Sequence, residues 1–364
     1  MNKRQRLDRV VAGQLPDRLP VLGGWIAYPR ALVELAGASV EDYHRTPREV
    51  AARAYKVLDV DGLVDLFVTK DVDAYRGIDE HTYLKADSGR SFDETVAMIE
   101  NLPEADEYAR QFDFAADYAR YRKWLAETQA LCGDMVYMPA NWCAGAKLSW
   151  YADYGYENFF LLIGLRPDLG AKLCRRGGVL GRHLSRLTAE AVKDGLYPKA
   201  VLLGEDVCTQ RGPMISMEFI EEHYAPALAY GLEPLLEVGC RPVWHSDGDV
   251  RPMLPMLLRC GIEGFQGFQP ECGMHLEDIV KLRTRDGKKL LIFGPLAVTT
   301  ELPVLTPDEV RAKVRHYADL CRDNADLVLF TSNTITPDVP VENIRAMHDE
   351  ARRYVYRNKR DKEL

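Results

Sequence analysis

The chain has 364 residues, of which 47% are apolar and 28% are charged, and its formal net charge is −8. This composition is typical of a folded globular protein and excludes disordered and collagen-like chains. The negative balance provides no overall positive field, so we expect neither nucleic acid nor an anionic membrane surface as a partner.

No stretch of the sequence approaches the roughly 18 consecutive apolar residues that a membrane-spanning helix needs. The opening residues MNKRQRLDRVVAGQLPDR also lack the apolar core of a signal peptide, so we expect a cytoplasmic protein. The eight cysteines include no CxxC pair. Their scatter argues against a zinc ribbon or a disulfide framework and predicts mostly buried thiols.

Eight short apolar runs, each followed by a helical pattern, predict a βα alternation. In chain order the predicted strands span residues 20–24, 62–68, 135–140, 200–204, 241–245, 264–269, 289–294 and 327–331. Eight parallel strands close a (β/α)8 TIM barrel, so we predict an α/β fold of this class. The main alternative is a doubly wound open sheet, but no GxGxxG motif follows the first strand.

Two Thr-Pro pairs mark predicted helix starts. The segments Thr46-Pro47-Arg48-Glu49 and Thr306-Pro307-Asp308-Glu309 both read as capping boxes with proline at the first helical position. A (β/α)8 barrel takes about 250 residues, so about 100 residues remain for other elements. We place an insertion after the second strand, at about residues 72–133, which opens with a polar hairpin-like stretch. No linker or repeat interrupts the chain, so residues 1–364 are predicted to form one domain.

In this fold the active site lies at the carboxyl ends of the strands. The fifth strand ends in Trp244-His245-Ser246-Asp247-Gly248. A histidine at a strand end, with a carboxylate two residues later, can act as a general acid or base or as a metal ligand. The alternative is that Asp247 and Gly248 only form a turn, beside a histidine that is merely hydrogen-bonded.

The fourth strand is followed by Glu205 and Asp206 and then by a loop that contains Gln210. Such a loop is typical of substrate binding, although it could also be a solvated connection that ends at a helix cap at Ser216. Consecutive strand residues point to opposite faces, so at most one of the two carboxylates needs to face a pocket.

Aromatic and amide side chains follow the third strand and could either line a planar ligand or pack under the insertion. Other polar or aromatic residues stand at the remaining strand ends. Together these residues are Trp25, Asp65, Asn141, Trp142, Tyr151, Gln266, Gln269 and Asn333.

Five segments together resemble the uroporphyrinogen decarboxylase superfamily, which also contains corrinoid methyltransferases. They are RLDRVVAGQLPDRLPV, GEDVCTQRGPMIS, HSDG, GIEGFQGFQPECGMHLEDI and ITPDVPVENIRAMHDEARRY. The resemblance covers nearly the whole chain and implies that superfamily's barrel.

The zinc methyltransferases of this superfamily carry HxC after strand five and a further cysteine after strand eight. Here the corresponding positions are His245, Asp247 and Asn333. Because both thiolates are missing, we expect no tightly bound zinc, and a weaker metal site would have to use His245, Asp247 and Glu205.

True uroporphyrinogen decarboxylases share an Arg-rich motif after strand one, an aspartate, a tyrosine and a histidine after strand eight. Asp65 and Tyr151 match the aspartate and the tyrosine, but Asn333 stands where the histidine should be and WIAYPR replaces the Arg-rich motif. The acidic strand ends also disfavour a substrate with eight carboxylates.

The resemblance therefore favours an HxDG-type member that moves a methyl group from a methoxylated aromatic or similar small donor to a partner corrinoid protein. The chain has no DxHxxG motif, so cobalamin would arrive on that partner. A homodimer is left open. The alternatives are a decarboxylase of a smaller acid and a non-catalytic barrel that binds a tetrapyrrole or a protein.

For the favoured function the residues divide into two groups. The catalytic candidates are His245, Asp247, Glu205 and Asp206, and the substrate-binding candidates are Trp25, Asp65, Asn141, Trp142, Tyr151, Gln210, Gln269 and Asn333.

Overall fold

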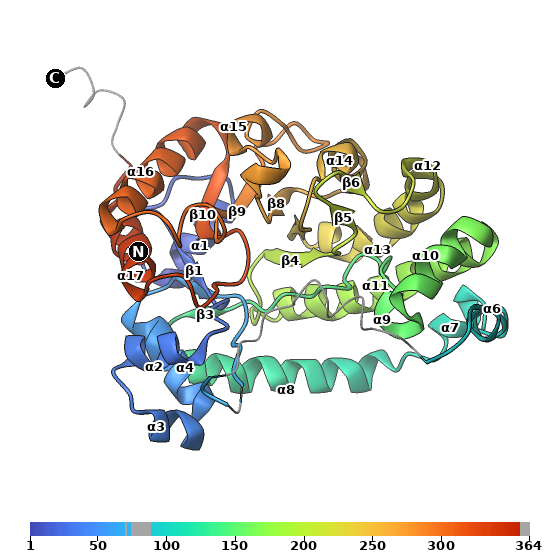
Figure 1. Ribbon diagram of the computed structural model, residues 1–364, viewed down its shortest axis with the longest axis horizontal. Helices are drawn as coiled ribbons and strands as arrows, with labels where there is room; N and C mark the ends of the chain where they lie inside the picture. The colour runs from blue at the N-terminus through green and yellow to red at the C-terminus, as the bar shows by residue number, and fades with distance from the viewer. Residues whose placement is uncertain (70, 74–88, 357–364) are drawn as a thin grey trace.

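The computed structural model describes residues 1–69, 71–73 and 89–356. The polar hairpin-like stretch predicted at the start of the insertion lies almost wholly outside these residues. The rest of the insertion is helical and contains α6 (Phe92–Glu100), α7 (Ala105–Ala109) and α8 (Phe114–Cys132). Helix α8 extends from the region of β3 toward α6 and α7 (Figure 1).

Two parallel sheets form the centre of the molecule. One has the strand order β1-β2-β3 and the other has the order β10-β9-β8-β7-β4. All eight predicted strands are present. Their bounds are β1 (Leu22–Gly23), β2 (Gly62–Leu63), β3 (Val136–Tyr137), β4 (Ala200–Gly204), β7 (Arg241–His245), β8 (Gly264–Gln266), β9 (Leu291–Leu296) and β10 (Asp326–Thr331).

The first three strands are shorter than predicted, because each pairs over only two residues. The backbone leaves the ladder at Gly24, where φ is +132° and a Cβ atom would lie 2.5 Å from the carbonyl oxygen of Asp65. Only glycine permits this close approach. The predicted strand over residues 62–68 ends at Leu63.

Backbone contacts join the edges of the two sheets. Val21 forms a parallel bridge with Leu329, and the Asn141 N–H donates to the Leu202 carbonyl at 2.8 Å. The molecule is thus a mixed α/β fold with parallel strands, and its strand order is compatible with a barrel-like arrangement.

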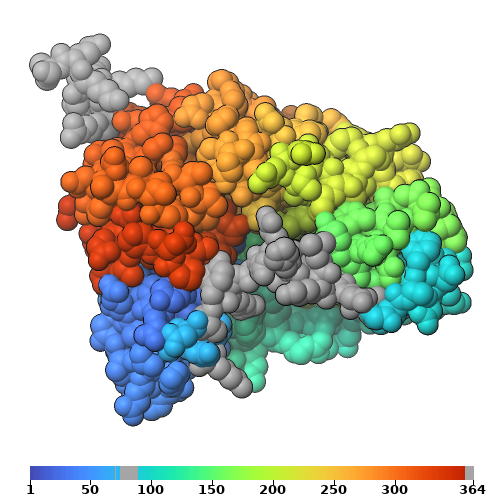
Figure 2. All heavy atoms as spheres, viewed as in Figure 1, coloured from blue at the N-terminus to red at the C-terminus, as the bar shows by residue number. Residues whose placement is uncertain are grey.

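Helices surround the strands, and a short antiparallel hairpin follows β4 (Figure 1). The amino-terminal part of the chain (blue) and the carboxyl-terminal part (red) lie side by side (Figure 2). The Leu19 N–H donates to the Tyr354 carbonyl at 3.1 Å. The remaining elements are α1 (Lys3–Val11), α2 (Pro29–Ala36), α3 (Val40–Arg45), α4 (Pro47–Val57), α9 (Tyr151–Tyr154), α10 (Tyr156–Leu165), α11 (Pro167–Lys193), β5 (Cys208–Thr209), β6 (Gly212–Pro213), α12 (Met217–Phe219), the π-helical turn η1 (Ile220–Tyr224), α13 (Ala225–Glu237), the 3-10 turn η2 (Arg251–Met253), α14 (Leu254–Cys260), the 3-10 turn η3 (Pro270–Cys272), α15 (Leu276–Ile279), α16 (Pro307–Asn324) and α17 (Val341–Arg353).

Only one of the two predicted Thr-Pro capping boxes forms. The Thr306 hydroxyl accepts from the Glu309 N–H, and the Glu309 carboxylate accepts from the Thr306 N–H at 2.8 Å. Thr46 makes no side-chain cap, so this part of the prediction is wrong. The reason is that Thr46 also ends α3, and its hydroxyl donates back to the Asp42 carbonyl at 3.3 Å.

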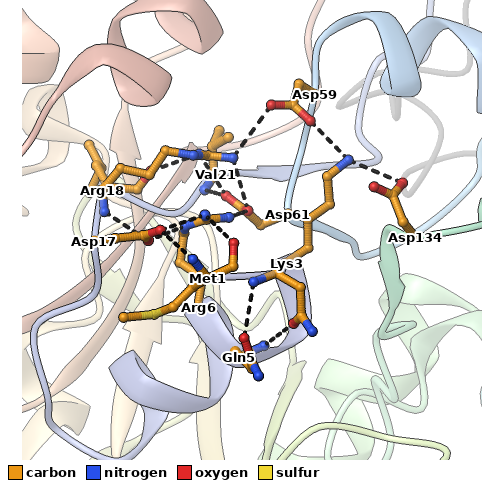
Figure 3. A network of polar contacts seen from close by, with 12 residues as sticks. Met1, Lys3, Gln5, Arg6, Asp17, Arg18, Val21, Asp59, Asp61 and Asp134 are labelled. Carbon is orange, nitrogen blue, oxygen red and sulfur yellow. Dashed lines mark hydrogen bonds and ion pairs between the residues drawn. The ribbon is translucent and has the colours of Figure 1, made fainter.

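A buried ion-pair network holds α1 against the amino ends of β1 and β2 (Figure 3). Asp61 is fully buried and accepts hydrogen bonds from Arg6, from Arg18 at 3.0 and 3.1 Å, and from the Val21 N–H at 3.0 Å. A buried carboxylate needs such partners because desolvation of an unpaired charge is costly. The network lies at the end of the sheet opposite the candidate site described below.

The eight cysteines are all free, and only Cys143 and Cys208 are partly exposed, as the sequence predicted. Throughout the described ranges, none of the helices combines the length and the apolar character needed to cross a membrane.

Candidate functional site

Parallel pairing of β4 with β7 brings three of the predicted catalytic residues together. Gly204 pairs with His245 at the last position of both strands, and Asp206 follows two residues later. The Nε2 atom of His245 lies 3.5 Å from Oδ1 of Asp206 and 3.9 Å from Oδ1 of Asp247. The Asp247 N–H also donates to Oδ1 of Asp206 at 3.1 Å. A Cβ atom at position 204 would lie 2.0 Å from the His245 carbonyl oxygen, so glycine is required at this strand end.

The opposite side of the His245 ring contacts Gln266 of β8. The ring Nδ1 hydrogen-bonds to Oε1 of Gln266, and Nε2 of Gln266 donates to the carbonyls of Thr331 at 2.8 Å and Ser332 at 2.9 Å. The next residue, Asn333, donates to both oxygens of Asp247, at 2.9 and 2.7 Å. Residues after β10 therefore support both the imidazole and a carboxylate.

Two tryptophans flank the His245 ring. The ring centroid of Trp25 lies 5.6 Å from that of His245, and the centroid of Trp142 lies 5.4 Å from it. The two indoles lie 5.9 Å apart, and Nε1 of Trp25 donates to Asp65 at 3.2 Å. Trp25 and Trp142 thus lie beside the histidine, and Asp65 contacts Trp25.

The cluster is electrostatically negative. Burial raises the pKa of Asp247 to about 6, His245 lowers this pKa and the neighbouring carboxylate of Asp206 raises it. Asp247 consequently holds a proton at higher pH than an ordinary aspartate does. Two adjacent carboxylates beside one imidazole favour binding of a cation or donation of a proton, and they disfavour binding of an anionic ligand.

The donor set fits a divalent metal ion. One ligand atom each from Asp206, His245 and Asp247 lies within 4.8 Å of the other two. A first-row metal binds nitrogen and oxygen ligands at about 2.0–2.2 Å, so small rotations would bring these atoms into range. The set contains no thiolate, which suits an exchangeable metal more than a tightly held zinc ion.

Glu205 lies outside this cluster. Its carboxylate accepts from the backbone N–H groups of Leu148 at 2.8 Å and Ser149 at 3.1 Å, and from the Ser149 hydroxyl. Asp206 takes the place that the sequence analysis offered to Glu205 as a third metal ligand. Burial raises the pKa of Glu205 to about 7 against these hydrogen bonds, which lower it.

Of the remaining predicted residues, two contact the loops of the cluster and two lie away from it. Gln269 accepts from the Gly248 N–H at 2.6 Å, and the Tyr151 hydroxyl donates to the Asp206 carbonyl at 3.3 Å. Both therefore support the loops of the cluster. Asn141 instead donates to Thr188 of α11 at 3.0 Å, and Gln210 is exposed between β5 and β6.

Gln266 was named above as a polar strand-end residue but not among the catalytic or substrate-binding candidates, and the structure places it directly against His245. The sequence feature that could have identified Gln266 is its polar side chain in the otherwise apolar strand Gly264-Phe265-Gln266. In a fully buried strand such a residue needs hydrogen-bond partners, and its partners here belong to the site.

No family model matches the sequence, and no curated protein matches it. A solved structure of a methyltransferase from Methanosarcina mazei has the same fold, with a TM-score of 0.59 over 97% of this chain and 99% of that chain. The two sequences are 15% identical. The likeness shows a methyltransferase-like fold.

Proposed function

We propose that the chain is a corrinoid-dependent methyltransferase of the uroporphyrinogen decarboxylase superfamily. In this proposal it moves a methyl group from a methoxylated aromatic or similar small donor to cobalt on a partner protein. The observation that carries the proposal is the cluster of Asp206, His245 and Asp247, which the strand ends assemble in a fold shared with a methyltransferase. The two joins between the sheets further support a closed (β/α)8 barrel, made by a single domain of residues 1–364 with an insertion at about 72–133.

The reaction requires a C–O bond to break while the methyl carbon bonds to Co(I). The bonding electron pair leaves on the oxygen, which must be neutralised. Asp247 is suited to give that oxygen a proton, because its raised pKa keeps part of its population protonated near neutral pH. Alternatively, with Asp247 unprotonated, a divalent ion held by Asp206, His245 and Asp247 would supply Lewis-acid stabilisation at that oxygen in place of the proton.

The flanking side chains suit an aromatic methyl donor. Trp25, which is buried, and Trp142, which is partly exposed, place two indoles beside His245, and indoles bind planar rings through stacked or edge contacts. The two carboxylates of the cluster also disfavour a polyanionic porphyrinogen as the substrate. Within the described ranges, Lys147 pairs with Asp153 at 2.6 Å and Arg30 pairs with Asp73, so neither cation is aimed at the two carboxylates.

The test is a methyl-transfer assay with the purified chain and reduced cobalamin, free or on a corrinoid protein. A panel of methoxylated benzoates and phenols is offered, and loss of the Co(I) absorption is followed together with release of the phenol. We expect methylation of cobalt with at least one donor. Conversion of uroporphyrinogen or of a smaller carboxylic acid, with no methyl transfer from the panel, would replace this function with a decarboxylase.

Metal content is a second test. We expect purified protein to lose any bound zinc on dialysis against a chelator, because thiolate ligands are missing from the donor set. Elemental analysis after dialysis measures this directly. One zinc ion retained per chain would contradict the expectation.

A further inference from the structure

The orientation of the Gln266 side-chain amide is fixed by its own partners. Its Nε2 atom lies 2.8 Å from the Thr331 carbonyl oxygen and 2.9 Å from the Ser332 carbonyl oxygen. Carbonyl oxygens only accept hydrogen bonds, so the amide nitrogen must face them. The amide oxygen is therefore left for His245.

The protonation of one ring nitrogen of His245 follows. Nδ1 hydrogen-bonds to Oε1 of Gln266, which is an acceptor, so Nδ1 must carry a hydrogen. In a neutral imidazole the other nitrogen, Nε2, then has a free lone pair. This lone pair belongs to the atom that lies 3.5 Å from Asp206 and 3.9 Å from Asp247.

The surroundings hold this arrangement rigidly. The residues Gln266 and His245 are 3% and 6% exposed, so water cannot easily replace the contact between their side chains. Gly267 has a φ of +92°, and a Cβ atom there would lie 2.8 Å from Nδ1 of His245. Glycine at 267 thus lets the end of β8 approach the imidazole.

We infer that Gln266 is a positioning residue that holds His245 in its Nδ1–H form and aims the Nε2 lone pair between Asp206 and Asp247. Mutation of a residue that fixes the tautomer of a metal-ligating histidine commonly lowers metal affinity 10- to 100-fold. The inference rests on the proposed function for its purpose, but the tautomer can be measured whether or not methyl transfer is found.

The experiment uses the full chain labelled with 15N in its histidine rings. The His245 signals are assigned by their loss in His245→Gln, and the spectrum is recorded without metal, at a pH where the ring is neutral. We expect Nδ1 to have the shift of a protonated nitrogen and Nε2 that of an unprotonated one. A wild-type ring with hydrogen on Nε2 alone would overturn the inference.

Variants of Gln266 separate positioning from stability. Gln266→Met keeps the volume but removes the acceptor, so we expect hydrogen to move to Nε2, where Asp206 accepts it. Gln266→Glu in its protonated form can donate to one of the two carbonyls and still accept from His245, so it should restore the Nδ1–H signal. If Gln266→Met fails to fold, the wild-type and Gln266→Glu spectra still show which ring nitrogen of His245 carries the hydrogen. A folded Gln266→Met with an unchanged ring spectrum would contradict the inference.

Gln129 provides a matched control. It also uses its amide on backbone groups, accepting from the Tyr137 N–H at 2.8 Å and donating to the Met135 carbonyl at 2.8 Å. Gln129→Met should lower stability and leave the His245 spectrum unchanged. In Zn²⁺ titrations against a competing chelator, Gln266→Met should bind 10- to 100-fold more weakly than Gln129→Met. Equal affinities would count against the inference.

Discussion

His245 is buried and ends a strand between two tryptophans, yet its ring nitrogens face two carboxylates and an amide. Its replacement should therefore affect chemistry more than folding. His245→Gln should lower methyl transfer by about 10² to 10⁴, the range typical of lost acid–base help. Its melting temperature should fall by about 2 °C, which corresponds to about 1 kcal/mol in a domain of this size.

His348 is a suitable control for this substitution. It is equally buried, on α17, where its Nδ1 hydrogen-bonds to the Ile344 carbonyl at 2.8 Å. His348→Gln should change stability and leave the turnover of folded protein unchanged. If His245→Gln kept its activity and lost stability instead, its role would be structural.

Glu205 should make stability depend on pH. Burial raises its pKa from 4.5 to about 7, so the folded state retains a proton that the unfolded state releases between these values. The free energy of unfolding consequently falls as the pH rises through this window. A pKa shift of this size changes the free energy of unfolding by on the order of 3 kcal/mol across the window.

The variant Glu205→Gln removes this titration. Its stability relative to wild type should rise by on the order of 2 kcal/mol between pH 5 and pH 8, measured by urea unfolding. Glu309→Gln is the control, because the backbone hydrogen bond to Thr306 lowers the pKa of Glu309 and leaves no titration in that range. Parallel pH profiles for wild type and Glu205→Gln would contradict the raised pKa.

The candidate site could be predicted in part, because strand ends in parallel sheets converge. This rule placed His245 and Asp247 together with Glu205 and Asp206, from their positions after two predicted strands. It could not decide which of Glu205 and Asp206 faces the histidine. That depended on the backbone of residues 148 and 149, which offers N–H groups to Glu205.

At the scale of elements, the two Thr-Pro helix starts provide a comparison within one chain. Thr306→Ala should destabilise the protein by about 1 kcal/mol, because it removes an acceptor from the first turn of α16. Thr46→Ala should cost less, since Thr46 caps no N–H group of α4. Denaturant unfolding of both variants measures the difference, and equal losses would contradict the assigned caps.

The same pair shows why elements are easier to predict than their ends. The Thr-x-x-Glu pattern is present at both sites, but at Thr46 the preceding helix ends on the same residue and uses its hydroxyl. The strands also were predicted correctly as elements, but the ends of some of them were not. β4 and β7 have their predicted bounds, whereas β1, β2 and β3 stop after two residues. Those ends depend on close approaches such as that of Gly24 to Asp65, which involve distant residues.

At the scale of the molecule, charge is arranged differently at the two ends of the strands. The amino ends carry paired charges: Asp61 with Arg6 and Arg18, and Arg241 with Asp326 at 2.8 Å. The carboxyl ends carry two neighbouring carboxylates beside one imidazole. Barrel enzymes commonly separate stability from function in this way, with chemistry at the carboxyl ends.

This separation predicts that Asp61 contributes to stability and not to catalysis. Asp61→Asn leaves Arg6 paired only with Asp17 and Arg18 paired only with Asp59, and removing one partner of a buried pair costs up to about 3–5 kcal/mol. Asp8→Asn, which removes only an exposed pair with Arg4 on α1, should cost less than about 1 kcal/mol.

Urea unfolding measures both losses, and methyl transfer is compared per folded molecule. Asp61→Asn should lower the unfolding midpoint while the turnover of the folded fraction stays at the wild-type value. A turnover that falls with unchanged stability would show that the amino ends of the strands are coupled to the site at their carboxyl ends.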